Sequence, residues 1–255
     1  MLFFETQNFF TSKQDTLNEG LAIKSEKIMK KKISIDIVSD VVCPWCFIGK
    51  RRLEKAMREL SEDYVFEIQW HPFELNPYIS AKGEDWLPMM TEKFGSANRL
   101  KQVFAHVTEI GKGEGIDFHF EKIKKAYRTL DLHKILHLAH AKGVQEALAE
   151  RLFVAYFTEG KDLSDMKVVA EILAPFGFTE NQLVHLKADD NAAHEIRNAI
   201  QYFQSLGISG VPFYILNGKV GLSGAQPSEV FIEAIQSLGE VPVADGEVCE
   251  VGSEC

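Results

Sequence analysis

Apolar and polar positions alternate near the beginning of the chain and predict a β-strand over residues 33–38. Ile33, Ile35 and Ile37 fall on one face of this strand, and polar residues separate them. After residue 43, apolar side chains recur at the spacing of a helix, and the basic residues between them are left for solvent. The apolar residues are Leu53, Ala56, Met57 and Leu60. Residues 64–71 return to a strand pattern, and Pro72 ends it because proline cannot donate to a sheet ladder.

From about residue 86 to residue 207 the pattern is almost wholly helical. The clearest predicted helices cover residues 131–141, 146–157, 166–173 and 191–206. The glycine-rich residues 111–115 lack the ending of a phosphate-binding loop, and we expect a flexible linker there.

The β pattern resumes near the end of the chain. Residues 212–216 and 219–222 flank Asn217 and Gly218, a pair typical of a two-residue hairpin turn, and residues 227–238 predict a final helix. This order predicts an α/β fold: a thioredoxin-like core, in which helices flank a central mixed sheet, interrupted by a large all-α insertion.

The same order sets the expected domain boundaries. Residues 33–80 and 207–240 form the thioredoxin-like domain, and residues 81–206 form the helical insertion domain. Residues 1–32 are expected to be an N-terminal extension that is disordered in part, and residues 241–255 a flexible tail.

Composition narrows the function classes. The formal net charge of −9 argues against nucleic-acid binding, which normally uses a basic face. No apolar run is long enough to span a membrane, and the N-terminal residues do not resemble a secretory signal, so we expect a cytoplasmic protein. Four cysteines are too few for a disulfide scaffold in a chain of 255 residues, so redox or metal chemistry is the better interpretation.

The sequence Cys43-Pro44-Trp45-Cys46 lies where the first strand leads into a helix. Backbone N–H groups and the helix dipole at a helix N-terminus favour a thiolate at Cys43, which we expect to be exposed. Cys46 would lie one turn deeper. We therefore predict that Cys43 attacks a disulfide and that Cys46 resolves the mixed disulfide. Asp40 either assists proton transfer from Cys46 or helps to end the strand.

Metal binding is the competing explanation of two cysteines at this spacing. A closed zinc site needs a second close pair, and Cys249 and Cys255 are more widely spaced than in a zinc knuckle. His133 and His137 are one helical turn apart, but no third ligand is evident, so we expect a surface or packing role for them. No metal or organic cofactor is predicted.

Val211 and Pro212 begin the returning hairpin. A thioredoxin-like fold would place Pro212 beside the cysteines, with a cis peptide bond before it. The backbone of Val211 could then pair with an extended substrate segment, while Pro44 and Trp45 complete the substrate-binding surface.

The motif and its surroundings resemble the DsbA-like superfamily of thioredoxin-fold oxidoreductases, specifically its FrnE-type branch. The similar stretches agree in order and spacing, and they are residues 33–49, 72–77, 129–133, 151–160 and 209–212. The resemblance implies disulfide oxidoreductase or isomerase activity, often linked to oxidative stress. It also implies that Cys249 and Cys255 form an accessory pair that exchanges with Cys43 and Cys46; the residues alone equally allow idle thiols or a local disulfide near the terminus. Arg128 departs from the family, in which an Asn is expected.

We therefore predict a cytoplasmic protein-disulfide oxidoreductase or isomerase. Its partners would be proteins with thiols or disulfides, and glutathione or a thioredoxin-type reductant, with no nucleic acid or membrane partner. A glutathione-dependent isomerase or transferase on the same scaffold is one alternative, although such relatives carry Ser where Cys43 stands. A zinc-stabilised binding module that uses all four cysteines is the other.

Overall fold

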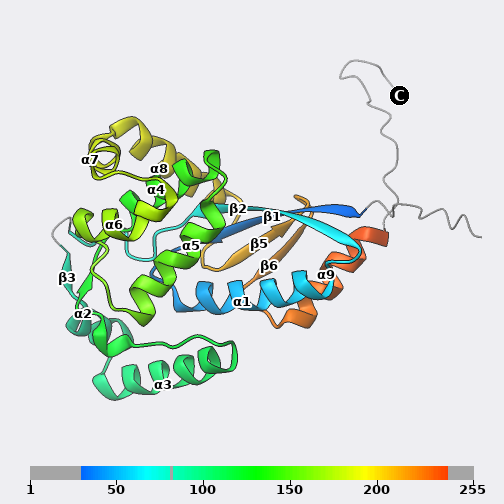
Figure 1. Ribbon diagram of the computed structural model, residues 1–255. Helices are drawn as coiled ribbons and strands as arrows, with labels where there is room; N and C mark the ends of the chain where they lie inside the picture. The colour runs from blue at the N-terminus through cyan, green and yellow to red at the C-terminus, as the bar shows by residue number, and fades with distance from the viewer. Residues whose placement is uncertain (1–29, 81–82, 241–255) are drawn as a thin grey trace, which may run out of the picture.

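A four-stranded mixed sheet forms the centre of the computed structural model, which describes residues 30–80 and 83–240. Its strand order is β2-β1-β5-β6, and the strands are β1 (Lys31–Ser39), β2 (Tyr64–Pro72), β5 (Phe213–Leu216) and β6 (Val220–Ser223). β1 runs parallel to β2 and antiparallel to β5, so two segments far apart in sequence lie side by side (Figure 1). The predicted strands, hairpin and mixed sheet are confirmed.

Helices α1 (Pro44–Glu59) and α9 (Ser228–Glu240) pack together along one face of the sheet (Figure 1). The inward side chains of β1 are almost wholly buried in this core; Ile33, Ile35 and Ile37 are 1–2% exposed. A smaller apolar cluster of Val38, Phe73, Phe203 and Ile208 forms separately. The alternation of apolar and polar residues in this strand predicted that the isoleucines would be buried, because successive side chains of a strand point to opposite faces.

The segment between β2 and β5 is mainly helical, as expected. Its α-helices are α2 (Trp86–Phe94), α3 (Ala97–Gly113), α4 (Leu130–Ala141), α5 (Gln145–Phe153), α6 (Met166–Leu173), α7 (Glu180–Ala188) and α8 (Asp190–Ser205). The prediction that this insertion is all-α is wrong in one detail, because the two-residue strands β3 (Glu84–Asp85) and β4 (Lys125–Ala126) pair with each other. The helix expected over residues 146–157 is α-helical only as far as Phe153. A turn of π-helix follows over Val154–Thr158.

The linker expected over residues 111–115 is also wrong, because α3 continues through Gly111 to Gly113. Gly111 lies against the buried ring of Phe118; a Cβ atom at this position would be 2.3 Å from Phe118 Cε2. The glycine therefore permits close packing of a helix on an aromatic ring rather than flexibility.

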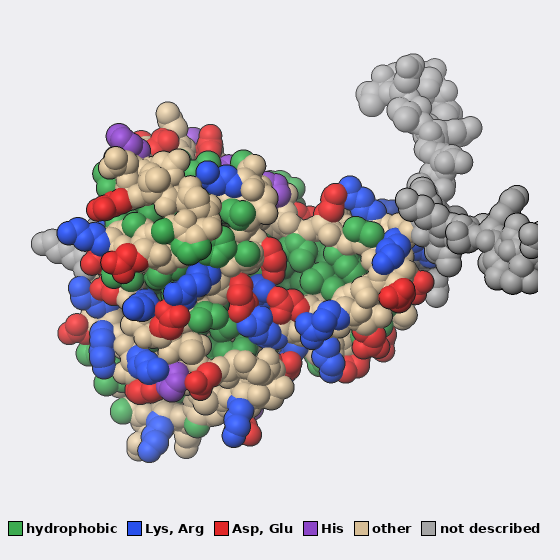
Figure 2. Space-filling view, in the orientation of Figure 1, with side chains coloured by type: hydrophobic (Ala, Val, Ile, Leu, Met, Phe, Trp, Pro, Cys, Tyr) green, Lys and Arg blue, Asp and Glu red, His purple; other side chains and the backbone are tan. Residues whose placement is uncertain are grey.

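The remaining expectations concern the surface charge, membrane spans and the two ends of the chain. Basic and acidic side chains are interspersed over the face drawn in Figure 2. Within the described ranges, no helix has both the length and the apolar character needed to cross a membrane. Most of the expected N-terminal extension and the tail with Cys249 and Cys255 lie outside the described residues. The division into domains stays a prediction.

We predict that alanine lowers the stability of the protein at one glycine of α3 but not at another. Gly111→Ala forces the Phe118 ring to move and should lower the free energy of unfolding by about 1–3 kcal/mol. Gly113→Ala is the matched control, because a Cβ there meets no atom within 4 Å, and it should leave stability unchanged or slightly raised. Urea unfolding of both variants checks this, and equal losses of stability would show that Gly111 is not a packing glycine.

Candidate active site

Cys43 and Cys46 lie at the N-terminus of α1, immediately after the turn that follows β1. The Cys43 N–H donates to the Asp40 carbonyl at 3.0 Å, which closes this turn, and Cys43 is the N-cap residue of α1. Its carbonyl accepts from the Cys46 N–H at 3.1 Å. Pro44 is the first helical residue, where its missing N–H costs no hydrogen bond. Both cysteines are free thiols.

The two thiols are more buried than the sequence suggested. Cys43 is 4% exposed and Cys46 is 1% exposed, so the prediction of an exposed Cys43 is wrong. Apolar side chains from the helical segment surround Cys43, which a pattern of local residues cannot reveal. Burial raises the pKa of Cys46 well above its usual value, and the neighbouring Cys43 sulfur raises it further. Cys46 therefore retains its proton at neutral pH.

The peptide bond between Val211 and Pro212 is cis, as predicted. Antiparallel pairing of β5 with β1 matches Phe213 with Val38, so the residues just before β5 lie beside the turn just after β1. The Cys43 thiol donates to the Val211 carbonyl at a sulfur–oxygen distance of 3.7 Å. The structure thus brings Cys43, Cys46, Val211 and Pro212 together.

Tyr214 is a residue of this site that the sequence analysis missed. It is wholly buried, and its hydroxyl group has no hydrogen-bond partner among the residues described. Burial raises the pKa of Tyr214 well above its usual value, and the nearby sulfur atoms of Cys46 and Cys43 raise it further. Gly49 makes this placement possible, since a Cβ atom there would lie 2.2 Å from the Tyr214 hydroxyl oxygen. The only sequence clue was an unexplained glycine in the first turns of an otherwise amphipathic helix.

Asp40 supports the backbone around the cysteines. Its side chain is buried, and its carboxylate accepts from the Leu75 N–H at 2.8 Å and from the Val42 N–H at 3.4 Å. His133 Nε2 lies 2.8 Å from the Phe73 carbonyl oxygen, and it is 3.7 Å from the Asp40 carboxylate. The contacts of Asp40 agree with its expected role at the end of the strand, and the role in proton transfer from Cys46 stays a prediction; the buried His133 has the expected packing role. Over the part of the chain that is described, no group of three or more His, Cys, Asp or Glu could hold a metal ion.

Arg128, the expected departure from the family pattern, forms an ion pair with Glu74. Its Nη2 atom is 3.6 Å from Glu74 Oε2, and Glu74 is only 6% exposed at its side chain. The arginine is therefore directed toward a buried carboxylate.

A cavity of about 210 Å³ adjoins Cys43. It is lined by Val42, Cys43, Pro44, Trp45, Leu75, Asn76, Trp86, Met89, Met90, Lys93, Phe94, Val103, Phe104, Val107, Phe120, Ala126, Tyr127, Tyr156, Phe157 and Val211. Three of the four predicted substrate-binding residues, Pro44, Trp45 and Val211, are thus at its wall, whereas Pro212 does not line it. Many of the other lining residues come from α2 and α3, which lie beyond the N-terminal end of α1 (Figure 1).

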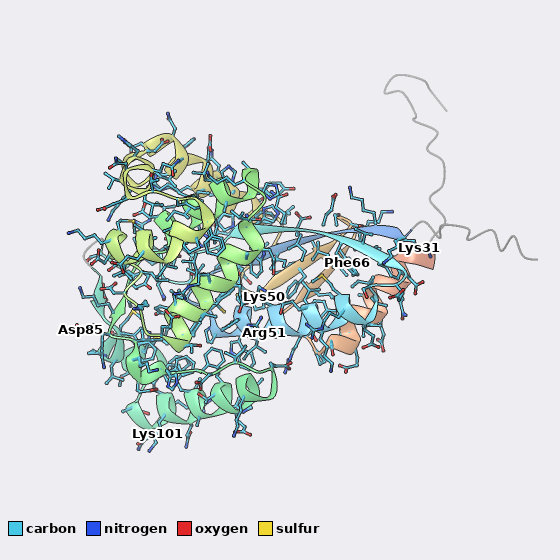
Figure 3. The ribbon with its side chains drawn as sticks, viewed as in Figure 1. Lys31, Lys50, Arg51, Phe66, Asp85 and Lys101 are labelled. Atoms are coloured by element: carbon cyan, nitrogen blue, oxygen red, sulfur yellow. The ribbon has the colours of Figure 1, made fainter. Side chains whose placement is uncertain are left out.

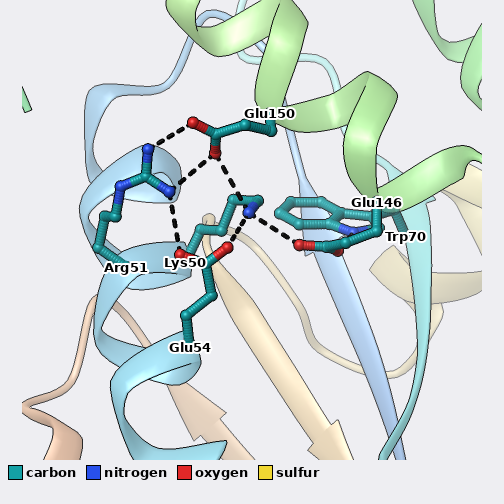
Figure 4. A network of polar contacts seen from close by, with 6 residues as sticks. All are labelled: Lys50, Arg51, Glu54, Trp70, Glu146 and Glu150. Atoms are coloured by element: carbon teal, nitrogen blue, oxygen red, sulfur yellow. Dashed lines mark hydrogen bonds and ion pairs between the residues drawn. The ribbon is translucent and has the colours of Figure 1, made fainter. Parts of the chain in front are cut away.

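A network of charged side chains joins α1 to α5, and its cations Lys50 and Arg51 are labelled in Figure 3. Lys50, which is 3% exposed, lies 2.8 Å from Glu146 and 3.1 Å from Glu150, and it also pairs with Glu54 (Figure 4). Arg51 contacts Glu54 at 2.9 Å and bonds Glu150 through both terminal nitrogens. The indole N–H of Trp70 on β2 donates to Glu146 at 2.5 Å.

The charges in this network stabilise one another despite their burial. Burial alone would lower the pKa of Lys50, but the carboxylates of Glu146 and Glu54 outweigh it and raise the pKa. Burial alone would raise the pKa of Glu54, but Lys50 and Arg51 lower it. These groups therefore remain charged near neutral pH, which fixes α5 against the helix that carries the cysteines.

Comparisons with known proteins agree with this geometry. The family model for the DSBA-like thioredoxin domain matches residues 34–236. The crystal structure of the probable DsbA oxidoreductase SCO1869 from Streptomyces coelicolor aligns with a TM-score of 0.75 and 30% identity, over 87% of this chain and 97% of that chain. The uncharacterized protein YwbO of Bacillus subtilis (strain 168) is 22% identical over 204 residues, which are 80% of this chain and 96% of that protein. The cytosolic disulfide reductase DsbM from Pseudomonas aeruginosa, solved with GSH, is 18% identical with a TM-score of 0.56, over 80% of this chain and 99% of that chain, and it shows the fold alone.

We predict that Gly49 and Tyr214 are energetically coupled. Gly49→Ala places a methyl group against the Tyr214 hydroxyl and should lower the free energy of unfolding by about 1–3 kcal/mol. Tyr214→Phe removes a buried hydroxyl without a partner and should change stability by less than about 1 kcal/mol. The double variant should regain most of the loss, because the atoms then nearest to the added methyl group would be the ring carbon of residue 214 and Pro212 Cγ, each 3.3 Å away.

A double-mutant cycle by urea unfolding measures this coupling. If the double variant is as unstable as Gly49→Ala alone, the hydroxyl group is not what the glycine accommodates.

Proposed function

Because the chain belongs to the DSBA-like thioredoxin domain family, we propose that it is a thiol–disulfide oxidoreductase that exchanges disulfides through Cys43 and Cys46. The observation that carries the proposal is the position of the Cys43 sulfur. It lies at the N-terminus of α1, 3.7 Å from the carbonyl oxygen before the cis proline, with the Cys46 thiol one turn deeper.

The two cysteines have different environments and therefore different roles. A thiolate is the attacking species, and Cys43 is the cysteine that lines the cavity, where a substrate disulfide can reach it. Burial and the adjacent Cys43 sulfur keep the Cys46 proton in place by raising the Cys46 pKa. Cys43 therefore attacks first, and Cys46 attacks only after the mixed disulfide on Cys43 has formed.

The exchange balances in two steps. The Cys43 thiolate attacks one sulfur of the substrate disulfide, and the other half leaves as a thiolate that takes up a proton. The Cys46 sulfur then attacks Cys43, which forms the Cys43–Cys46 disulfide and releases the second half as a thiol. The protein dithiol gives up two electrons and the substrate disulfide accepts them. The reverse sequence oxidises a substrate dithiol.

Several finer expectations stay predictions. Membership of the FrnE-type branch, a role in oxidative stress, a cytoplasmic location and protein substrates rest on the sequence alone. Exchange with Cys249 and Cys255 also stays a prediction, because both cysteines lie outside the described residues. The same holds for a zinc site that would use them.

A glutathione-dependent isomerase or transferase remains the second candidate, and one observation favours it: a mainly apolar cavity of about 210 Å³ beside Cys43, which could hold an apolar co-substrate. The presence of both cysteines favours disulfide exchange instead. Tight glutathione binding by a protein that shows no thiol exchange would support the second candidate.

Single-turnover reduction of bis(2-hydroxyethyl) disulfide tests the proposed function. Pre-reduced full-length protein, freed of reductant, should release both halves of the disulfide as thiol. Cys46→Ser should release only one half and stop as a mixed disulfide on Cys43, detected by intact mass. Cys43→Ser should be slower by about 100-fold or more, because the attacking thiolate is gone.

The matched control is the double variant Cys249→Ser, Cys255→Ser, which removes two thiols but keeps the proposed pair. It should retain the fast release of thiol. If Cys43→Ser reacts as fast as the unmodified protein, the proposed function is wrong.

A further inference from the structure

Helices α2 and α3 supply much of the lining of the cavity beside Cys43. Trp86, Met89, Met90 and Phe94 recur at helical spacing on α2 and all line the cavity. Phe104 of α3 joins Trp86 and Phe120 in a stack of rings, with centroid separations of 5.2 Å and 4.3 Å. These side chains therefore line the same cavity as Cys43.

The cavity has the size of one substituted ring. Its volume of about 210 Å³ is somewhat larger than the roughly 150 Å³ of an apolar protein cavity known to bind benzene. An extended peptide segment with several side chains does not fit into this volume. Flat aromatic walls and the adaptable thioethers of Met89 and Met90 suit an apolar ring.

Burial of Cys43 restricts which disulfides can reach it. With 4% of its surface exposed, Cys43 does not present its sulfur at the protein surface, where a disulfide of a folded protein would have to meet it. Asn76 and Lys93 provide a polar part of the cavity lining, and Lys93 Nζ donates to Asn76 Oδ1 at 3.2 Å in an exposed position. A substrate can therefore place an apolar half inside and a polar half toward solvent.

We propose that the cavity binds a single aromatic ring and that the substrate of Cys43 is a low-molecular-weight disulfide with one aromatic half. This inference rests on the proposed function and narrows its substrate class. The Cys43 thiolate attacks the sulfur attached to the aromatic half, and the polar half leaves as a thiolate that takes up a proton. Attack of Cys46 on Cys43 then releases the aromatic thiol and oxidises the cysteine pair.

Two mixed disulfides of similar chemical reactivity test the proposal. 2-Hydroxyethyl benzyl disulfide carries a ring, whereas 2-hydroxyethyl ethyl disulfide carries only two carbons in its place. The second-order rate constant of pre-reduced, full-length protein should be at least about 10-fold larger for the benzyl compound, because a ring fills an apolar site that an ethyl group leaves largely empty. Equal rate constants, or faster reduction of insulin than of the benzyl compound, would overturn the proposal.

A variant that fills the cavity distinguishes ring binding in the cavity from a general disturbance of α2. Met90→Trp should lower the ratio of the benzyl rate constant to the ethyl rate constant by about 10-fold. Leu87→Trp is the matched control, because Leu87 is on the same helix but is 60% exposed and does not line the cavity. If both variants lose activity equally with both disulfides, the cavity does not select the ring.

A binding measurement keeps this proposal distinct from the proposed function. Two of the three tryptophans, Trp45 and Trp86, line the cavity, so ring binding should change tryptophan fluorescence. Titration of the Cys43→Ala variant with the benzyl disulfide should give a saturable change, and titration with the ethyl disulfide a much weaker one. Absence of a saturable change overturns the ring site even if exchange occurs. Saturable binding by a protein that reduces neither disulfide supports the ring site and contradicts the proposed function.

Discussion

The pairing of β1 with β5 is the constraint on which the candidate site depends. It joins two strands from opposite ends of the described chain, and it places the Val211 carbonyl beside a cysteine 168 residues earlier in sequence. Neither segment could form the site alone, because α1 supplies the sulfurs and the start of the β5–β6 hairpin supplies the carbonyl and the cis proline. Any change that shifted the register of β5 would therefore separate the two halves of the site.

The helical segment is fixed to this core by two kinds of contact. On the charged side, Lys50 and Arg51 of α1 bind carboxylates of α5 in a partly buried network, and breaking it would leave the charge of the buried Lys50 uncompensated. On the apolar side, Phe47 stacks on Phe153 at a centroid distance of 5.2 Å. Both contacts start from residues within two turns of Cys46, so the position of α5 is tied directly to the thiols.

The parts of the site that depend on local pattern could be predicted from the sequence. Alternating isoleucines, the helix after Cys43 and the Asn217–Gly218 turn each have a local signature, and the family pattern added the cis bond at Pro212. The burial of Cys43 could not be predicted, because many of the residues that cover it come from α2 and α3, more than forty positions away. The packing roles of Gly49 and Gly111 could not be predicted for the same reason, because each accommodates a side chain that only the fold brings near.

The central claim is that Cys43 and Cys46 form one dithiol–disulfide couple. The most direct measurement is equilibration of the full-length protein in glutathione buffers of graded potential, followed by acid quenching, alkylation and peptide mapping. We expect both cysteines to convert together, in one two-electron transition, to a disulfide that links residues 43 and 46. Alkylation of both thiols at every potential, or separate glutathione adducts on each without a link between them, would contradict the claim.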